Sequence, residues 1–322
     1  MFFINAKYEG TNDWWQYMLT IIFVAFGMIL GSLPFTVAVA IGIRNTHPEF
    51  SAAQTQEFIK SMDFSGLDID SNLLLVLMLL QFVFGLGFLY LMVRTLHKKR
   101  FESLISAWNR VKWKKILRSF WIWFGLLALF ELINYWMNPG NYIWNYRPAT
   151  FFTLLAIAIF IIPLQTSLEE IFIRGYIMQG LGIAFKNRWA PILISSLIFM
   201  ALHGANPEIA AFGVYKMLTY YFLVGFFFAV ITVMDDGLEI PLGFHAANNI
   251  FSAVILTFKG STLQTEALFI SKDANTDDMI LSTIIIFLII MIAAHKLLKW
   301  GDWSKLWSRI DFQTIKNDIA EL

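Results

Sequence analysis

The sequence predicts an all-α membrane protein, in which about eight transmembrane helices surround a polar cavity that faces the cytoplasm. The first observation is composition: the 322 residues are 58% hydrophobic and only 15% charged, whereas soluble proteins average about 45–50% and about 25%. The second is the spacing of the apolar residues, which form runs of membrane-spanning length. The absence of cysteine bears on function instead, since it excludes disulfides, thiolate catalysis and cysteine-ligated metal sites.

Eight apolar runs come close to or exceed the about 20 residues that a transmembrane helix requires. They lie at residues 17–43, 73–95, 117–136, 150–185, 189–206, 213–234, 238–258 and 278–298. The chain has no internal repeat and no soluble segment of domain size. We therefore expect one structural domain within the membrane.

The run at 150–185 is too long for one straight crossing, since a helix rises about 1.5 Å per residue and would extend over about 50 Å. It contains Pro163, so we expect a kinked helix whose second half lines a cavity. Two separate helices, the second lying in the membrane interface, are the alternative.

Basic residues predict the orientation of the helices, because Lys and Arg concentrate in cytoplasmic loops. The segment from Arg94 to Arg118 is rich in both, and we expect it inside, with His97 as an ordinary surface residue. The segment from Arg44 to Asn72 is acidic, as an external loop can be. An even number of spans then places both termini in the cytoplasm.

Two segments have the apolar spacing of helices that lie on the inner leaflet among basic residues. They are residues 101–111 and 303–310. Ordinary packing beside the membrane is the alternative for both.

The stretch SLEEIFIRGY, from Ser167 to Tyr176, places two carboxylates and an arginine in an apolar run. Ionisable side chains in such a position indicate a functional site. Glu170 and Arg174 are four residues apart and can pair on one helix face. Glu169 lies about 100° further round the helix and lacks such a partner, which suits it to act as a general base. A buried ion pair that only fixes helix packing is the alternative.

Two of the five histidines lie in apolar helices. His203 ends the segment FMALH, with Phe199 one turn before it. His245 begins HAANN, with Asn249 four residues further on and therefore on the same helix face. A single histidine in such a helix is more often a hydrogen-bonded core residue, but two beside a paired-glutamate helix indicate a site.

At these three motifs the chain resembles the CPBP family, which comprises CAAX-type prenyl endopeptidases and the bacteriocin-processing and self-immunity (Abi) proteins. The matching residues, in order, are Glu169, Glu170, Arg174, Phe199, His203, His245 and Asn249. The resemblance covers about residues 150–258 and implies that this segment is a catalytic core. Residues 1–149 would supply the first membrane helices with the basic cytoplasmic loop, and residues 259–322 the last transmembrane helix and an interfacial C-terminal helix.

The resemblance implies an intramembrane endopeptidase in the bacterial plasma membrane. Glu169 would activate a water molecule that His203 helps to position. His245 and Asn249 would donate hydrogen bonds to the oxyanion of the tetrahedral intermediate. Glu170, Arg174 and Phe199 would support them.

A zinc ion is the alternative to a metal-free mechanism, because Glu169, His203 and His245 form a set of two histidines and one carboxylate. These ligands come from three separate helices, without an HExxH-like pair to anchor two of them. We therefore expect no cofactor, with zinc as the second choice.

We expect the partners to be the lipid bilayer and a peptide or membrane-anchored protein substrate, prenylated or carrying a leader peptide, and no nucleic acid. A non-catalytic immunity or scaffold protein of the same family is the main alternative function. A transporter with a buried proton relay is the third, but the two halves show no paired interrupted helices.

Overall fold

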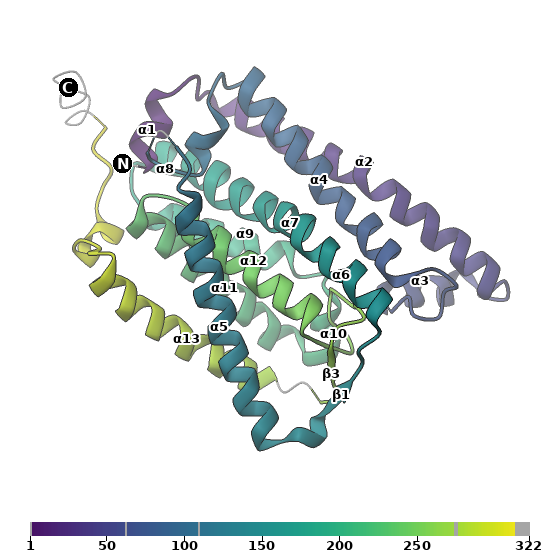
Figure 1. Cartoon of the computed structure of the whole chain (residues 1–322). Helices are drawn as coiled ribbons and strands as arrows, with labels where there is room; N and C mark the ends of the chain where they lie inside the picture. The colour runs from purple at the N-terminus through teal and green to yellow at the C-terminus, as the bar shows by residue number, and fades with distance from the viewer. Residues whose placement is uncertain (1, 62, 109, 274–275, 313–322) are drawn as a thin grey trace.

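Long helices dominate the computed structural model, which describes residues 2–61, 63–108, 110–273 and 276–312 (Figure 1). The helices are α1 (Phe2–Tyr8), α2 (Trp14–Thr46), α3 (Ala52–Ser61), α4 (Ser71–Thr95), α5 (Trp113–Met137), α6 (Pro148–Phe160), α7 (Ile162–Glu170), α8 (Met178–Phe185), α9 (Trp189–Leu202), α10 (Pro207–Phe212), α11 (Val214–Asp235), α12 (Glu239–Val254) and α13 (Thr276–Leu297). Short 3-10 helices are η1 (Phe101–Leu104), η2 (Pro139–Asn141) and η4 (Trp303–Trp307), while η3 (Ile171–Ile177) is a π-helix.

Each of the eight predicted apolar runs contains at least one helix. Within the described residues, six helical stretches are long and apolar enough to cross a membrane: α2, α4, α5, the continuous stretch Pro148–Phe185, α11 and Ile280–Leu297 in α13. This confirms an all-α polytopic membrane protein. The other two, α9 and α12, have only 14 and 16 residues, which at about 1.5 Å per residue is shorter than the bilayer core of about 30 Å.

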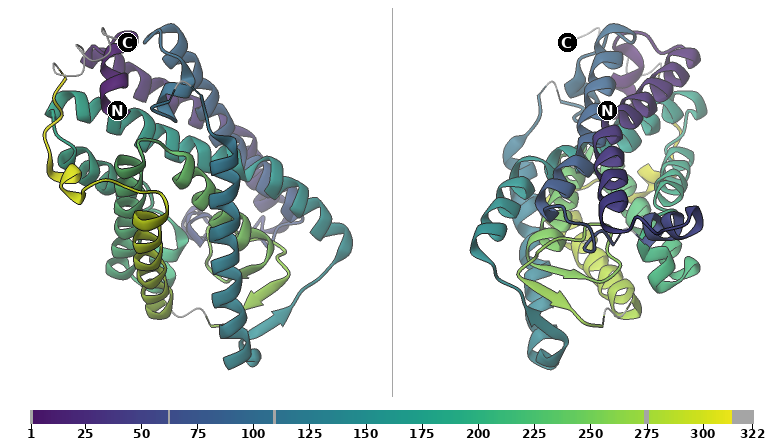
Figure 2. Two further views of the ribbon diagram at one scale, coloured as in Figure 1. Left: turned by 60° about the vertical axis from the view of Figure 1, so that its left-hand side comes forward. Right: turned by 90° about the vertical axis from the view of Figure 1, so that its right-hand side faces the viewer.

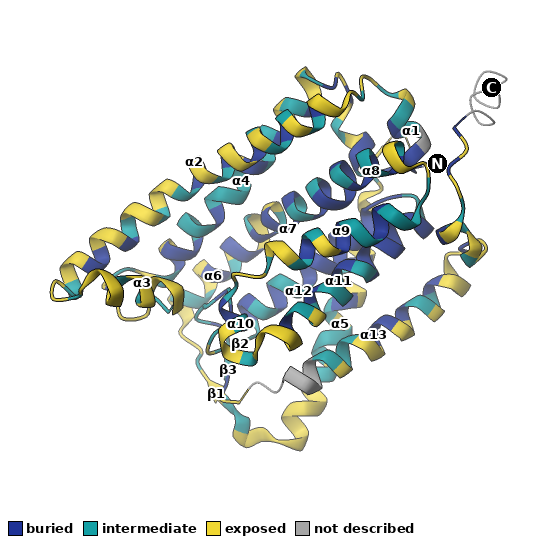
Figure 3. Cartoon of the chain, turned by 180° about the vertical axis from the view of Figure 1, so that it is seen from behind, coloured by how far each residue is buried: buried dark blue, intermediate teal, exposed yellow. Residues whose placement is uncertain are grey.

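Burial follows the pattern of a membrane protein, with apolar side chains facing outward as well as inward. The outer helices α2 and α5 expose large apolar residues along their length, including Ile22, Phe26, Ile29, Trp121 and Leu132. The centre is formed by α11 and α12, most of whose residues are buried (Figure 3). Lipid therefore surrounds a protein core in which α12 contacts α5, α6, α7 and α11.

Pro163 breaks the long run as predicted. Helix α6 ends at Phe160 and α7 begins at Ile162, so that Pro163 lies in the first turn of α7. A proline is tolerated there, because the first turn of a helix needs no N–H donor.

The bundle has two distinct ends. One carries residues 94–108, residues 110–112 and α1, and we call it the basic end. The other carries a small sheet and is called the sheet end (Figure 2). In the sheet, β3 (Phe269–Ser271) lies between β1 (Tyr142–Trp144), which is antiparallel to it, and β2 (Leu256–Phe258), which is parallel.

The structure differs from the sequence prediction at the two interfacial segments. Residues 101–104 and 303–307 form short 3-10 helices rather than amphipathic α-helices. Leu104, Leu306 and Ile310 are buried in the main hydrophobic core, whereas Trp108 and Trp307 are exposed, so protein packing takes up only part of each apolar face. Residues 313–322 of the predicted C-terminal segment lie outside the described residues.

His97 is also not the surface residue that its polar sequence context suggested. It is fully buried at the basic end. Its Nδ1 lies 2.9 Å from the carbonyl oxygen of Thr11, and its Nε2 lies 2.7 Å from the hydroxyl of Tyr176. The prediction was wrong because the N-terminal segment folds back over the end of α4, a contact between residues that are far apart in the sequence.

Candidate active site

The two adjacent glutamates at the end of α7 lie in different environments. Glu170 is fully buried, and its Oε1 accepts hydrogen bonds from Arg174 Nη1 at 2.8 Å and from His245 Nδ1 at 2.7 Å. The side chain of Glu169 remains 14% exposed, and its Oε1 accepts a hydrogen bond from Gln165 Nε2 at 3.0 Å. The arginine therefore pairs with Glu170, while a neutral amide contacts Glu169.

Arg174 is held deep in the protein by the π-helix η3, which begins directly after Glu170. Its guanidinium carbon lies 4.1 Å from the centre of the Phe199 ring, and its Nη2 donates to the carbonyl oxygen of Gly225 at 3.5 Å. Such cation–π contacts help to offset the loss of hydration of a buried charge. Wide helical turns of this kind occur often at functional sites.

Both predicted histidines face the same oxygen atom of Glu169. Its Oε2 lies 3.8 Å from His203 Nε2 and 3.6 Å from His245 Nε2. His203 caps the C-terminus of α9, and its ring packs between those of Phe199 and Tyr221. His245 is buried in the middle of α12. Three helices thus bring together residues that are up to 76 positions apart in the sequence, from Glu169 to His245.

The hydrogen bonds of the two rings fix where their protons lie. His203 Nδ1 is 2.8 Å from the carbonyl oxygen of Phe199, which can only accept, so this nitrogen carries the proton. His245 Nδ1 likewise donates to Glu170 Oε1. Each neutral ring then has a lone pair on Nε2. Glu169 Oε2 is buried without a hydrogen-bond partner among the described residues, so three acceptors face one another and require a donor between them.

Water meets this requirement, because it has two O–H donors and keeps its own lone pairs for reaction. An acceptor-lined site of this kind can orient a water molecule with its oxygen toward an electrophile. The chemistry that the arrangement supports is therefore general-base activation of water.

Asn249 joins the group through a residue that the sequence analysis did not single out. Its Nδ2 donates to Gln165 Oε1 at 3.3 Å, and Gln165 in turn donates to Glu169. Gln165 lies four residues before Glu169, so the helical spacing alone could have identified it as a neighbour. All seven residues predicted from the motifs therefore lie in one connected cluster.

Zinc fits the donor types of Glu169, His203 and His245 but not their positions. Ligand atoms of a tetrahedral zinc site lie about 3.3 Å apart, given bond lengths of about 2.0–2.1 Å, whereas Glu169 Oε2 lies 3.6 and 3.8 Å from the two nitrogens. Across the described part of the chain, no group of three or more His, Asp or Glu side chains is arranged to hold a metal ion. We derive no reaction step through a metal.

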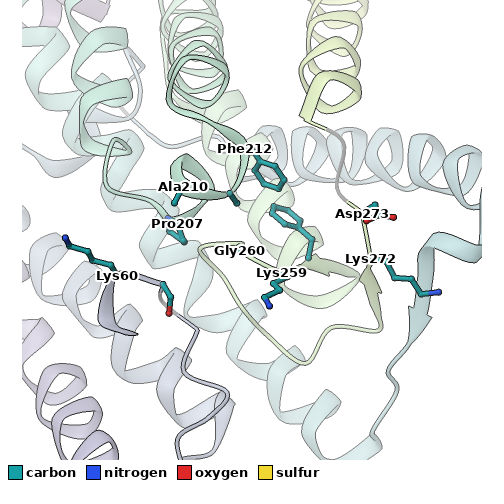
Figure 4. A pocket seen from close by; sticks show the side chains of 11 residues that line it. Lys60, Pro207, Ala210, Phe212, Lys259, Gly260, Lys272 and Asp273 are labelled. Carbon is teal, nitrogen blue, oxygen red and sulfur yellow. The ribbon is translucent and has the colours of Figure 1, made fainter. Parts of the chain in front are cut away.

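A cavity of about 550 Å³ at the sheet end is separate from this cluster (Figure 4). Its lining includes α10, the end of β2 and three lysines, Lys60, Lys259 and Lys272, but none of the seven motif residues. Lys60 and Lys272 extend away from each other (Figure 4). The lysines therefore do not converge on a common ligand position.

Comparison with known proteins gives two matches. The family model described as "Type II CAAX prenyl endopeptidase Rce1-like" matches residues 148–251. The "Uncharacterized protein YyaK" of Bacillus subtilis (strain 168) is 30% identical over 254 residues, which is 79% of this chain and 81% of that protein. No solved structure matches the chain significantly.

Proposed function

The chain belongs to the Rce1-like type II CAAX prenyl endopeptidase (CPBP) family, and we propose that it is an intramembrane endopeptidase that uses Glu169 to activate water. The observation that carries this proposal is the position of Glu169 Oε2, which lies within 3.8 Å of Nε2 of both His203 and His245. A water molecule at this position would donate one hydrogen to Glu169 Oε2 and the other to His203 Nε2, which would orient and activate it.

The reaction begins when this water attacks the carbonyl carbon of the scissile peptide bond. Glu169 takes one proton from the water as the new C–O bond forms. His203 accepts the hydrogen bond from the second O–H and so directs the oxygen lone pair away from the protein. The attack gives a tetrahedral intermediate whose oxygen carries a negative charge.

Asn249 is the proposed donor to this oxyanion. Its Nδ2 has two hydrogens, and only one is used by Gln165. The motif resemblance implies a donor role for His245 as well, but its Nδ1–H donates to Glu170 and leaves a lone pair on Nε2, so we assign His245 no hydrogen bond to the oxyanion. The intermediate collapses when the C–N bond breaks and the proton held by Glu169 passes to the leaving amine.

We propose that this mechanism needs no metal, since Glu169 Oε2 lies 3.8 and 3.6 Å from the two imidazole nitrogens, farther than the about 3.3 Å expected between the ligand atoms of a zinc site. The substrates would be peptides or membrane-anchored proteins, which reach the site from the bilayer. The basic end would face the cytoplasm of a bacterial plasma membrane, with both termini inside.

Cleavage of candidate peptides by the purified protein tests the function. The peptides are a farnesylated CAAX peptide and a leader peptide with a double-glycine end, each with and without a chelator. We expect Glu169→Gln to abolish cleavage and Asn249→Ala to lower kcat by about 10²–10³-fold, the usual cost of one oxyanion donor. Glu57→Gln, at an exposed glutamate on α3, is the matched control and should remain fully active.

Three results would count against this mechanism. Full activity in Glu169→Gln would remove the proposed base. Activity lost with the chelator and restored by zinc would establish the metal-dependent alternative. An intact protein that cleaves neither peptide class, and whose biological effect survives Glu169→Gln, would be a non-catalytic immunity or scaffold protein.

A further inference from the structure

Gln165 connects the two halves of the site. It lies one helical turn before Glu169 on α7, and it is 8% exposed. Its Nε2 donates to Glu169 Oε1 at 3.0 Å, and its Oε1 accepts from Asn249 Nδ2 at 3.3 Å. The carboxylate on α7 and the amide on α12 are thus joined by one side chain that uses both of its polar atoms.

These two contacts leave the Gln165 amide only one orientation. An ionised carboxylate has no proton to give, so Glu169 must face the Gln165 nitrogen. The Gln165 oxygen therefore faces Asn249, which must present its own nitrogen. Asn249 Oδ1 accepts from Asn248 Nδ2 at 3.3 Å, which is consistent with this assignment.

This single orientation of Gln165 affects both the carboxylate of Glu169 and the amide of Asn249. With Oε1 of Glu169 occupied by Gln165, the other carboxylate oxygen is the one that faces His203 and His245. With one hydrogen of Asn249 Nδ2 bound to Gln165, the second hydrogen remains for a ligand. A rotation of the Gln165 amide by half a turn would disturb both arrangements together.

The two adjacent glutamates are held by different partners. Arg174 pairs with Glu170 through its guanidinium at 2.8 Å, whereas Gln165 holds Glu169 through a neutral amide at 3.0 Å. Gln165 therefore fixes the orientation of the Glu169 carboxylate without placing a second charge beside it.

We propose that Gln165 is a positioning residue for peptide hydrolysis, which sets the orientation of the Glu169 carboxylate and of the Asn249 amide at the same time. This inference rests on the proposed endopeptidase function. It assigns Gln165 no contact with the substrate, so its loss acts on the chemical step and not on substrate binding.

The first test is a comparison of kcat and KM for the wild type and Gln165→Leu, with the peptide that the wild type cleaves. A catalytic group misplaced by about 1 Å can cost about 10²-fold in rate, so we expect kcat to fall by about 10–10²-fold while KM changes by less than about threefold. Gln179→Leu is the matched control. Gln179 is another buried glutamine of the same long helix, bonded to the carbonyl oxygen of Ser103 at 2.9 Å, and its variant should keep the wild-type kcat.

The second test needs no enzymatic activity and uses the apparent Tm of the purified protein. Gln165→Glu alone places two carboxylates side by side and should lower Tm. Combined with Glu169→Gln, it exchanges donor and acceptor, so the hydrogen bond re-forms and the contact with Asn249 is kept. We expect Tm to return to within about two degrees of the wild type, while kcat remains lost because the base is gone.

The outcomes separate the two proposals. Wild-type kcat in Gln165→Leu, or an equal loss of kcat in Gln179→Leu, would overturn the positioning role. So would a double variant whose loss of Tm is the sum of the two single losses. An inactive wild type with a restored Tm in the double variant would instead overturn the endopeptidase function and leave Gln165 as the residue that orders the cluster.

Discussion

Glu169 and Glu170 are neighbours in the sequence, yet their surroundings give them opposite roles. Successive residues of a helix point about 100° apart, so Glu170 faces the buried Arg174 while Glu169 faces the two imidazoles. The ion pair is fully buried on both sides. Burial makes such a pair costly to break, because the remaining charge has no water to solvate it.

Glu170→Gln tests this difference at the level of stability. The variant leaves Arg174 buried with a neutral partner, and we expect it to destabilise the protein by about 3 kcal/mol, as measured by thermal or denaturant unfolding in detergent. Adding Arg174→Met should recover part of the loss. Glu266→Gln, which neutralises the half-buried partner of the exposed Arg147 at 4.0 Å, should cost less than about 1 kcal/mol. Equal effects of Glu170→Gln and Glu266→Gln would contradict the argument.

His97 makes the stability of the basic end depend on pH. Burial lowers the pKa of His97 below its ordinary value of 6.5, so the unfolded chain takes up a proton before the folded one as the pH falls. His97 therefore contributes stability above about pH 6.5 that is lost at lower pH. We expect the free energy of unfolding to fall as the pH is lowered from about 7.5 to about 5.5. In His97→Gln, the free energy of unfolding should depend less on pH over this range. Parallel loss of stability in both proteins would show that other groups are responsible.

At the scale of secondary structure, the long helix from Pro148 to Phe185 contains two irregularities. The sequence predicts the first, at Pro163, but not the second, the π-helix η3. Pro163 lies at the start of α7 and accounts for the break after α6. The π-helix η3 has no such local cause. The N–H of Met178, for example, bonds to the carbonyl oxygen of Ile173, five residues back. This wide turn accompanies the insertion of Arg174 beneath Phe199 and Gly225, which is a tertiary contact.

Close approach of α12 and α5 depends on Gly243. A Cβ atom at this position would lie 2.4 Å from the carbonyl oxygen of Ile116 and 2.8 Å from the amide nitrogen of Phe120. Both are backbone atoms that cannot move aside individually. The two helices therefore pack at this point with a contact that only glycine allows.

We expect Gly243→Ala to separate α12 from α5 and to lower stability by about 1–3 kcal/mol, the usual cost of overpacking. Because α12 carries His245, cleavage should fall as well. Gly125→Ala is the matched control on α5, where a Cβ would meet nothing within 4 Å, and it should be neutral or slightly stabilising. The measurement is apparent Tm for both variants, and a stable Gly243→Ala protein would disprove the close contact.

At the scale of the whole molecule, the loops that join the helices at the basic end contact one another. The N–H of Phe2 donates to Asp236 at 3.2 Å, and Lys305 pairs with the same carboxylate at 2.9 Å. Lys115 pairs with Asp235 at 2.5 Å. Segments from α1, the start of α5, the end of α11, the α11–α12 turn and η4 therefore share one side of the bundle.

Single-cysteine variants test the orientation, because the chain has no cysteine of its own. Lys114→Cys lies at the basic end and Lys259→Cys at the sheet end, and both positions are exposed. We expect a membrane-impermeant maleimide added to intact cells to label Lys259→Cys, and to label Lys114→Cys only after the membrane is opened. Labelling of Lys114→Cys in intact cells, with Lys259→Cys labelled only after the membrane is opened, would show the opposite topology.

Local patterns predicted much of this protein. Apolar run length gave the helices, Pro163 gave the break, and the four-residue spacing of Glu170 and Arg174 gave their ion pair. The predictions that failed, or that were not made, involve distant segments: the burial of His97 by the N-terminal residues, the packing of Leu306 and Ile310 into the core, and the position of Gln165 between two helices.

The sequence by itself determined that the chain lies in a membrane and which side chains are chemically able to form a site. These properties depend on hydrophobicity and on spacing within single helices, which short-range geometry controls. Only the tertiary structure decided that Glu169 Oε2 faces both imidazoles and that Gln165 links it to Asn249. Those distances depend on how separate helices tilt and pack, and packing is a property of all the contacting surfaces together.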